Sequence, residues 1–333
     1  MADEDDDLAG YCIEQRVGES SRNTAEPPVG VEESRPRIEP DPHRSKYATS
    51  PVRWSVVVPT KVGWPHLEST LPPLMAALGA KDEVIVVGDG SDPGVRGEAD
   101  PRCRTVVHSG TAGFAPVCNR GAAEARGRLL FFLNDDVVVF PGILETLERE
   151  LSPPGIGAVG PDVLSEALGR SESGTSLFWH HGVLEARQHP LEGSGRVPVP
   201  YLCGAALAIR RSDFDRLGGF DERLAPYFWE DTDLSLRTRA LVGATAVACG
   251  ATVRHRHGGT VGSIPSRTRR TIYERNRFLV SWKHLRGWQW VAHLGWLPLR
   301  LASSAVTDQA ALVGFFRALG SLRSKRNGDA RRG

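Results

Sequence analysis

Three short, almost wholly apolar runs constrain the fold of this chain more than any other feature. They cover residues 54–58, 84–87 and 129–133. Runs of four or five apolar residues have the length of buried strands. Pro59 is expected to stop the first run and Gly88 the second. Continuous apolar strands of this kind occur in parallel sheets that are covered on both faces.

Segments with helical spacing separate these runs. Leucines and a methionine recur every three or four residues from His66 to Leu78, where Pro72 and Pro73 are expected to disturb the early turns. A helix of small residues is predicted from about Val117 to Ala125, and another strand from Thr245 to Val253. This alternation predicts an α/β fold with a mostly parallel sheet flanked by helices, in which ligands bind beyond the carboxyl ends of the strands.

Polar residues gather directly after two of the predicted strands. Residues 89–92 read Asp-Gly-Ser-Asp, and residues 134–136 read Asn-Asp-Asp. Either cluster alone could equally be a turn, because Asp, Asn and Gly are common turn residues. Two acidic clusters at successive strand ends of one sheet also bring like charges together, which a bound cation or another partner would offset.

Charge is distributed unevenly along the 333 residues, although the formal net charge is only +1. Residues 1–50 hold 12 acidic and 6 basic side chains and are rich in Pro, Ser and Glu, which predicts a disordered leader. This leader lacks the pattern of a signal peptide, and the five cysteines lack the spacing of a zinc site or a disulfide framework. We therefore expect a cytoplasmic protein with reduced thiols.

Seven segments in order resemble glycosyltransferase family 2, and in particular its rhamnosyltransferase-like members. They read VVVPT at 56–60, VVGDGS at 86–91, GFAPVCNRG at 113–121, FLNDDV at 132–137, CGAA at 203–206, GGFDE at 218–222 and WEDTDL at 229–234. Each segment alone is a weak signal, whereas all of them in order are a strong one. The resemblance implies a GT-A (Rossmann-like) fold, inverting sugar transfer from a nucleotide diphosphate, and Mg²⁺ or Mn²⁺ as cofactor.

The resemblance assigns the strand ends to the donor and its metal. Asp136 takes the place of the last aspartate of the family's metal-binding motif, whose first acid is replaced here by Asn134. His255 matches an additional metal ligand, and Asp135 is expected to face the ribose or the sugar. Asp89 matches the aspartate that reads the base. The residues expected at the nucleotide are Pro59, Thr60, Asp89, Gly90, Asn119, Asn134 and Asp135.

Glu230 and Asp231 form the expected catalytic pair. An inverting transfer needs one carboxylate to take the proton of the acceptor hydroxyl as its oxygen attacks the anomeric carbon. The resemblance makes Asp231 this base, and makes Glu230 a residue that orients the acceptor or supports a loop. The alternative is a helix N-terminal box, since Asp233 suits the first turn of a helix that continues through Leu234.

Three more residues, Trp229, His257 and Arg275, are expected to contact the acceptor or the phosphates. His257 follows His255 at a spacing that lets two imidazoles approach one metal, although lone histidines are more often structural. Arg275 and Asn276 resemble the Arg-Asn pair that closes the conserved core of the family.

The C-terminal part of the chain is basic and rich in tryptophan. Residues 267–333 hold 14 basic and 3 acidic side chains, and no stretch reaches the roughly 20 apolar residues that span a bilayer. A helical extension of this composition could lie at a membrane surface, or could be a helical pair packed on the catalytic domain. No nucleic-acid motif accompanies the charge, so nucleic acid is not an expected partner.

The sequence thus predicts a leader at 1–50, a GT-A catalytic domain at 51–276 and an extension at 277–333. The catalytic domain divides into a nucleotide-binding half at 51–137 and an acceptor half at 138–276. The expected donor is a dTDP- or UDP-sugar, for example dTDP-rhamnose, and the expected acceptor is a glycan or a lipid-linked saccharide. Contact with the inner face of the cell membrane and a homo-oligomer stay open. The alternatives are a sugar nucleotidyltransferase and an inactive, membrane-associated binding protein of the same fold.

Overall fold

The computed structural model describes residue 47 and residues 49–95, 100–257 and 264–329, so the predicted leader lies almost wholly outside the described residues. The strands of its central sheet are β1 (Trp54–Thr60), β2 (Glu83–Asp89), β3 (Cys103–His108), β4 (Leu129–Leu133), β5 (Val137–Val139), β6 (Ile156–Ser165), β7 (Arg170–Ser171), β10 (Arg196–Pro198), β11 (Ala206–Arg210) and β12 (Ala244–His255). A separate hairpin consists of β8 (Gly174–His180) and β9 (Val183–His189).

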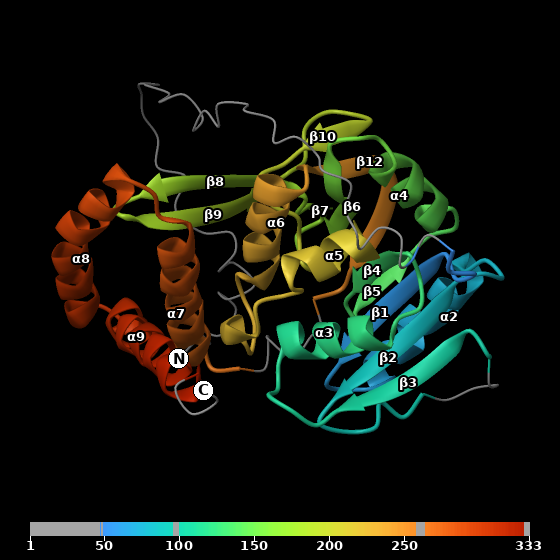
Figure 1. The fold of residues 1–333 in the computed structure, drawn as a ribbon, viewed down its shortest axis with the longest axis horizontal. Coiled ribbons are helices and arrows are strands. Elements are labelled where there is room, and N and C mark those ends of the chain that lie inside the picture. Colours follow the sequence, from blue (N-terminus) through green and yellow to red (C-terminus); the bar gives the residue numbers. More distant parts are fainter. Residues whose placement is uncertain (1–46, 48, 96–99, 258–263, 330–333) are drawn as a thin grey trace, which may run out of the picture.

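The strand order of the sheet is β10-β12-β6-β11-β4-β1-β2-β3, with β5 and β7 paired to β12 and β6 (Figure 1). The neighbours β3, β2, β1 and β4 are parallel, as are β6 and β12, while β11 is antiparallel to both of its neighbours. The predicted α/β fold with a mostly parallel sheet is confirmed. Two details were wrong. Gly88 does not stop β2, which continues to Asp89, and Pro59 does not stop β1 but pairs in register with Val87. The pairing of β1 with β4 ends at Val57, so Pro59 lies where β1 has lost one neighbour and a missing N–H is tolerated.

The helices flank this sheet and continue beyond it. They are α2 (Trp64–Ala77), α3 (Phe114–Glu124), α4 (Ile143–Leu151), α5 (Arg211–Leu217), α6 (Glu230–Leu241), α7 (Ser266–His284), α8 (Trp288–Val306) and α9 (Ala310–Asp329). Both early helices were predicted. Pro72 and Pro73 lie inside α2 without ending it.

Alternation along the strands gives the sheet two apolar faces. Val56 packs in the core that includes Leu67 of α2 and residues of α4, whereas Val57 packs in the core that includes Val117 of α3 and residues of α5 and α6. Each such side chain that leaves water stabilises the fold by roughly 1.5–3 kcal/mol. Helices on both faces leave the carboxyl edge of the parallel strands for polar residues.

A third core joins the hairpin to the C-terminal helices. It contains Val183 of β9, Phe278 of α7 and Ala318 of α9, and Figure 1 shows this group at the end of the molecule opposite to β3. The predicted start of the extension, residue 277, falls within α7, so one continuous helix crosses the predicted boundary. Among the described residues no helix is both long and apolar enough to cross a bilayer.

Candidate functional site

The parallel strands deliver the predicted donor residues to one edge of the sheet. β1 ends at Thr60, β2 ends at Asp89, and β4 is followed directly by Asn134. Thr60 pairs with Gly88 across the two strands, so the ends of β1 and β2 are level. The edge that the sequence predicted for ligand binding is therefore formed by the predicted residues.

Thr60 and Asp135, which the sequence placed at the nucleotide, contact each other. The Thr60 hydroxyl donates to Oδ2 of Asp135 at 2.5 Å, and His66 Nδ1 of α2 lies 3.5 Å from the same oxygen. Burial, opposed by the Thr60 hydrogen bond, raises the pKa of Asp135. His66 is a member of this edge that sequence reasoning missed.

Asp89 and Asn119 connect the strand ends to other segments. Asp89 Oδ2 accepts a hydrogen bond from the backbone N–H of Gly113 at 3.1 Å, at the start of α3. The Asn119 side chain exchanges hydrogen bonds with the backbone of Phe220 and donates to Glu222, all at 2.9 Å. Asn119 thus fixes α3 to the segment that leads toward α6. Gly90 beside Asp89 has a φ of 86°, a conformation that favours glycine, and no atom lies within 4 Å of where its Cβ would be.

Strand pairing brings His255 to Asp136. β12 pairs with the short strand β5, which puts His255 opposite Val137, the residue after Asp136. His255 Nε2 lies 3.3 Å from Asp136 Oδ1. These residues are more than a hundred positions apart in the sequence, and both were predicted as metal ligands.

The structure adds Glu172, which sequence reasoning missed. Glu172 follows β7, and its backbone N–H donates to Val163 of β6 at 2.9 Å. Its side chain is 4% exposed and has one oxygen 3.3 Å from His255 Nδ1 and the other 2.9 Å from His257 Nε2. Glu172, His255 and His257 together could hold a metal ion. No local sequence motif indicates Glu172, because its position depends on the pairing of the two-residue strand β7 with β6.

The acidic and imidazole side chains of this cluster stabilise one another's charged forms. Burial opposes ionisation of Glu172, but hydrogen bonds from His255 and His257 lower the pKa of its carboxyl to about 2. Burial likewise opposes protonation of His255, but Asp136 and Glu172 raise the pKa of its imidazole to about 9. His255 is therefore a cation between two carboxylates in the metal-free protein, and a divalent ion would take the place of one of its protons.

The arrangement of Asp136 and His255 fits a divalent cation. Within the described part of the chain, Asp136 Oδ1 is buried without a hydrogen-bond partner of good geometry, and the nearest donor is His255 Nε2 at 3.3 Å. Two adjacent ligands of an octahedral cation, each at about 2.1 Å, lie about 3.0 Å apart, and the measured separation is 3.3 Å. Carboxylate oxygen and imidazole nitrogen are donors that suit Mn²⁺ and similar ions.

Glu230 and Asp231 begin α6 behind an unusual turn. Phe228 and Trp229 have φ angles of 77° and 74°, which large side chains rarely adopt. Such conformations cluster at functional sites, where the surrounding structure holds them. Asp231 Oδ2 accepts the N–H of Gly204 at 2.9 Å, and Oδ1 accepts the N–H of Thr232 at 2.6 Å.

The two carboxyls differ in their surroundings. Glu230 is 8% exposed, and its Oε2 has no hydrogen-bond partner among the described residues. Burial, with the neighbouring Asp231 charge, raises the pKa of Glu230 far above its usual range. Burial also raises the pKa of Asp231, but its hydrogen bonds with Thr232 and Gly204 oppose that shift. Asp231 is thus the member of the pair that ionises more readily.

A single short segment connects the acidic pair to the metal side of the site. Gly204 donates to Asp231, and the carbonyl of the next residue, Ala205, accepts the N–H of Asn134 at 2.9 Å. Asn134 begins the Asn-Asp-Asp sequence that ends in Asp136. The predicted catalytic pair and the predicted metal-binding sequence therefore both contact the Gly204–Ala205 segment.

Arg275 and Asn276 of α7 hold the segment before the acidic pair. Arg275 donates to the carbonyls of Arg223 and Ala225, and Asn276 Nδ2 lies 2.6 to 2.9 Å from three carbonyl oxygens, those of Leu224, Tyr227 and Phe228. Arg275, predicted to contact the acceptor or phosphates, is thus engaged with backbone. Trp229 is 3% exposed, and its indole packs 5.5 Å from the Tyr273 ring, so it is covered in this structure.

The chain is similar to known proteins. Residues 55–218 match the family described as Glycosyl transferase family 2. N-acetylglucosaminyl-diphospho-decaprenol L-rhamnosyltransferase of Mycobacterium tuberculosis is 28% identical over 273 residues, which cover 72% of this chain and 87% of that protein. O-antigen biosynthesis protein RfbC of Myxococcus xanthus is 30% identical over 172 residues, covering 47% of this chain and 13% of that protein.

A solved structure supports the fold. GalNAc-T7, determined with UDP, GalNAc and Mn²⁺, superposes with a TM-score of 0.53 at 18% identity. The superposition covers 69% of this chain and 47% of that one. At this identity the likeness concerns the fold, which is the GT-A fold expected from the sequence.

Proposed function

The chain belongs to glycosyltransferase family 2, and from this premise we propose that it moves a sugar from a nucleoside diphosphate to a hydroxyl of a lipid-linked saccharide, with inversion at the anomeric carbon. The observation that carries the proposal is the Gly204–Ala205 segment, which contacts Asp231 on one side and, on the other, Asn134 at the start of the sequence that ends in Asp136. Inverting transfer needs both a base for the acceptor and a positive charge for the leaving group.

Asp136 and His255 would hold Mg²⁺ or Mn²⁺. A bound divalent cation supplies positive charge that stabilises the diphosphate as it leaves. Glu172 would orient His255 from the opposite edge of the imidazole, since metal-binding histidines commonly donate their other N–H to a carboxylate. The strand-end residues Thr60, Asp89 and Asp135 would contact the nucleoside and the sugar of the donor.

Asp231 would act as the base. The acceptor oxygen forms a bond to the anomeric carbon while the bond from that carbon to the diphosphate oxygen breaks. The hydroxyl proton passes to the Asp231 carboxylate, and the nucleoside diphosphate departs. Glu230 is the weaker candidate, because a buried carboxyl with a strongly raised pKa stays protonated and cannot accept a proton.

The proposed substrate class is taken from the name of the mycobacterial relative. The mycobacterial relative acts, by its name, on a sugar linked through diphosphate to decaprenol and transfers L-rhamnose. We therefore propose a dTDP- or UDP-linked deoxyhexose such as dTDP-rhamnose as donor, and a saccharide on a polyprenyl diphosphate as acceptor.

Nucleoside diphosphate release tests the proposal. The full chain is incubated with a panel of dTDP- and UDP-sugars, with and without Mn²⁺ and an N-acetylglucosaminyl diphospholipid, and the anomeric configuration of the product is determined by NMR. We expect release that depends on both Mn²⁺ and acceptor. Release of inorganic diphosphate from a nucleoside triphosphate would instead indicate a nucleotidyltransferase, and donor binding without turnover would indicate an inactive binding protein.

A further inference from the structure

Helix α8 exposes many large apolar side chains to solvent and directs its charged residue and its histidine toward the protein. Its large exposed side chains are all apolar, namely Trp288 (71% exposed), Trp290 (41%), Val291 (75%), Leu294 (62%), Trp296 (42%), Leu299 (63%) and Val306 (84%). Trp288, Val291, Leu294 and Leu299 recur every three to five residues and share one side of the helix. A helix that faced only water would show the reverse pattern.

The inward side of α8 combines Leu297 and Leu301, which pack against the third core, with polar residues that have specific partners. His293 is 2% exposed, accepts the indole N–H of Trp282 at 2.9 Å, and has its other nitrogen 2.7 Å from the Gly182 carbonyl. Arg300, the one charged residue in the α8 sequence, is paired with Glu274 at 3.2 Å. These contacts fix which side faces out, so the apolar side cannot turn inward without breaking them.

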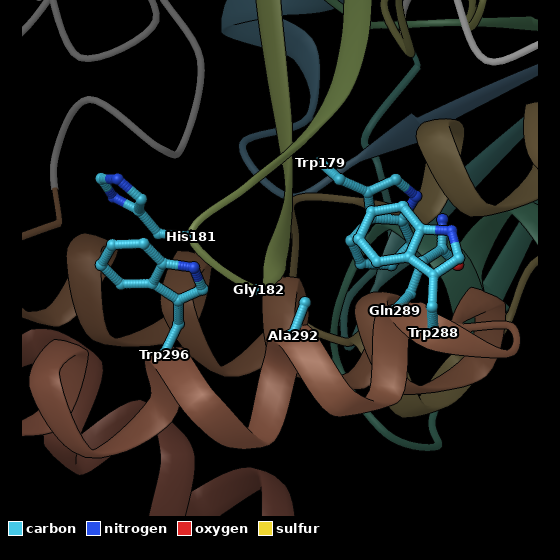
Figure 2. Close-up of a pocket in the computed structure, with 7 residues that line it drawn as sticks. All are labelled: Trp179, His181, Gly182, Trp288, Gln289, Ala292 and Trp296. Carbon is cyan, nitrogen blue, oxygen red and sulfur yellow. The ribbon is translucent and has the colours of Figure 1, made fainter.

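A small cavity of about 140 Å³ adjoins this surface at the turn of the β8–β9 hairpin. Figure 2 shows Trp179 beside Trp288 at one side of it, and His181 over Trp296 at the other, with Gly182 and Ala292 between. The rings of His181 and Trp296 are in contact, with centroids 4.3 Å apart and planes tilted by 33°. Indole groups with an apolar body and one N–H suit the boundary between lipid headgroups and acyl chains.

We propose that this outer surface of α8, extended by the aromatic cavity, lies in the interface of an anionic lipid bilayer. Charge favours lipid over a second copy of the chain. Residues 285–333 hold eight basic and two acidic side chains, and one of those acids, Asp308, is already paired with Arg270. Two copies meeting through α8 would bring like charges together, whereas anionic headgroups attract basic groups that flank an apolar helix.

The surface is connected to the candidate site by a rigid element. β8 starts two residues after Glu172 and ends beside α8, and seven strand residues span about 23 Å at about 3.3 Å each. A saccharide on a membrane lipid would thus have to extend about the length of β8 to reach the site. This last link depends on the proposed function, whereas binding to the bilayer does not.

Vesicle flotation of the full chain tests the surface. We expect binding to vesicles of phosphatidylcholine with phosphatidylglycerol, and weaker binding to phosphatidylcholine alone. Val291→Asp and Leu299→Asp should each lower the partition coefficient about tenfold or more, because a side chain that leaves water becomes a charge. Leu241→Asp, a change at a 52% exposed residue of α6, is the matched control and should bind like the wild type.

Two results would overturn the assignment. One is wild-type protein that does not float with the anionic vesicles. The other is a dimer, measured by light scattering, that Val291→Asp dissociates while vesicle binding is unchanged, which would make the surface a contact between copies. Donor-induced thermal shift should be the same in all variants, so that loss of membrane binding is distinguished from failure of the proposed glycosyl transfer.

Discussion

Replacing Glu172 by glutamine should weaken the binding of Mn²⁺ and preserve the fold. Glutamine keeps the size of the side chain, but its amide nitrogen cannot accept a hydrogen bond. The two carboxylate oxygens face His255 and His257, at 3.3 and 2.9 Å. The single amide oxygen of Glu172→Gln can accept a hydrogen bond from one oxygen position only. His255 therefore loses the acceptor that fixes its ring, or competes with His257 for it.

The expected magnitude follows from the position of Glu172 behind His255. Removing a group that orients a metal-bound histidine costs about 10- to 100-fold in metal affinity, which corresponds to about 1.4 to 2.8 kcal/mol. Asp136 still offers its buried oxygen in Glu172→Gln, so binding should be weakened and not abolished.

The assay is a titration of the full chain with MnCl₂ in the presence of UDP or dTDP, in which electron paramagnetic resonance measures free Mn²⁺. It reports affinity without turnover. Glu83→Gln is the matched control, because Glu83 is 2% exposed, compared with 4% for Glu172, and lies at the opposite end of β2 from the site. Unchanged Mn²⁺ affinity in Glu172→Gln, or an equal loss in Glu83→Gln, would refute the orienting role.

Four further predictions follow from the same geometry. Asp136→Ala should abolish Mn²⁺-dependent binding of the nucleoside diphosphate in calorimetry, and retained binding would reject Asp136 as the main ligand. Asp231→Asn should keep donor binding but lower the transfer rate constant by at least ~100-fold, whereas Glu230→Gln should chiefly raise the Michaelis constant for the acceptor; exchanged results would exchange the roles. Removing residues 1–50 should leave turnover intact, since their composition cannot bury a core, and a folded but inactive truncation would contradict this. Burial raises the pKa of Glu83, but hydrogen bonds with Ser55 and Arg126 and the Arg104 charge lower it overall below 4.5, so its stabilising effect should be full above that pH and lost as the pH falls through its folded value; denaturant unfolding of wild type and Glu83→Gln should converge in acid.

The sequence predicted the part of the site that local patterns encode. Apolar runs gave the strands, and polar residues directly after them gave Thr60, Asp89 and Asp136, because the carboxyl ends of parallel strands meet at one edge. Glu172 could not be found this way. It lies in a short polar stretch, and only the pairing of β6 with β7 and of β6 with β12 brings it to His255.

Other features depended on contacts that a single sequence does not reveal. Phe228 and Trp229 adopt left-handed backbone conformations that their residue types disfavour, so local propensity argued against that turn. The tryptophan-rich extension left two interpretations open, an interfacial helix and a packed helical pair. In the structure α8 packs one side on the protein and exposes the other, which local periodicity could not decide because both sides carry large apolar residues, for example Leu297 inward and Leu299 outward.

Direct contacts join the C-terminal helices to the segment that carries Glu230 and Asp231. Asn276 of α7 binds the carbonyl of Phe228, two residues before Glu230, and Lys283 of the same helix lies 2.8 Å from Asp233 of α6. Asp233 is fully buried, and charges in such a place need their partners, so α6 cannot move independently of α7. Because α7 also packs in one core with α9 and the hairpin, the outward side of α8 keeps a fixed orientation to Asp231. A bilayer bound at α8 would therefore set the direction from which a lipid-linked acceptor reaches Asp231, the proposed base.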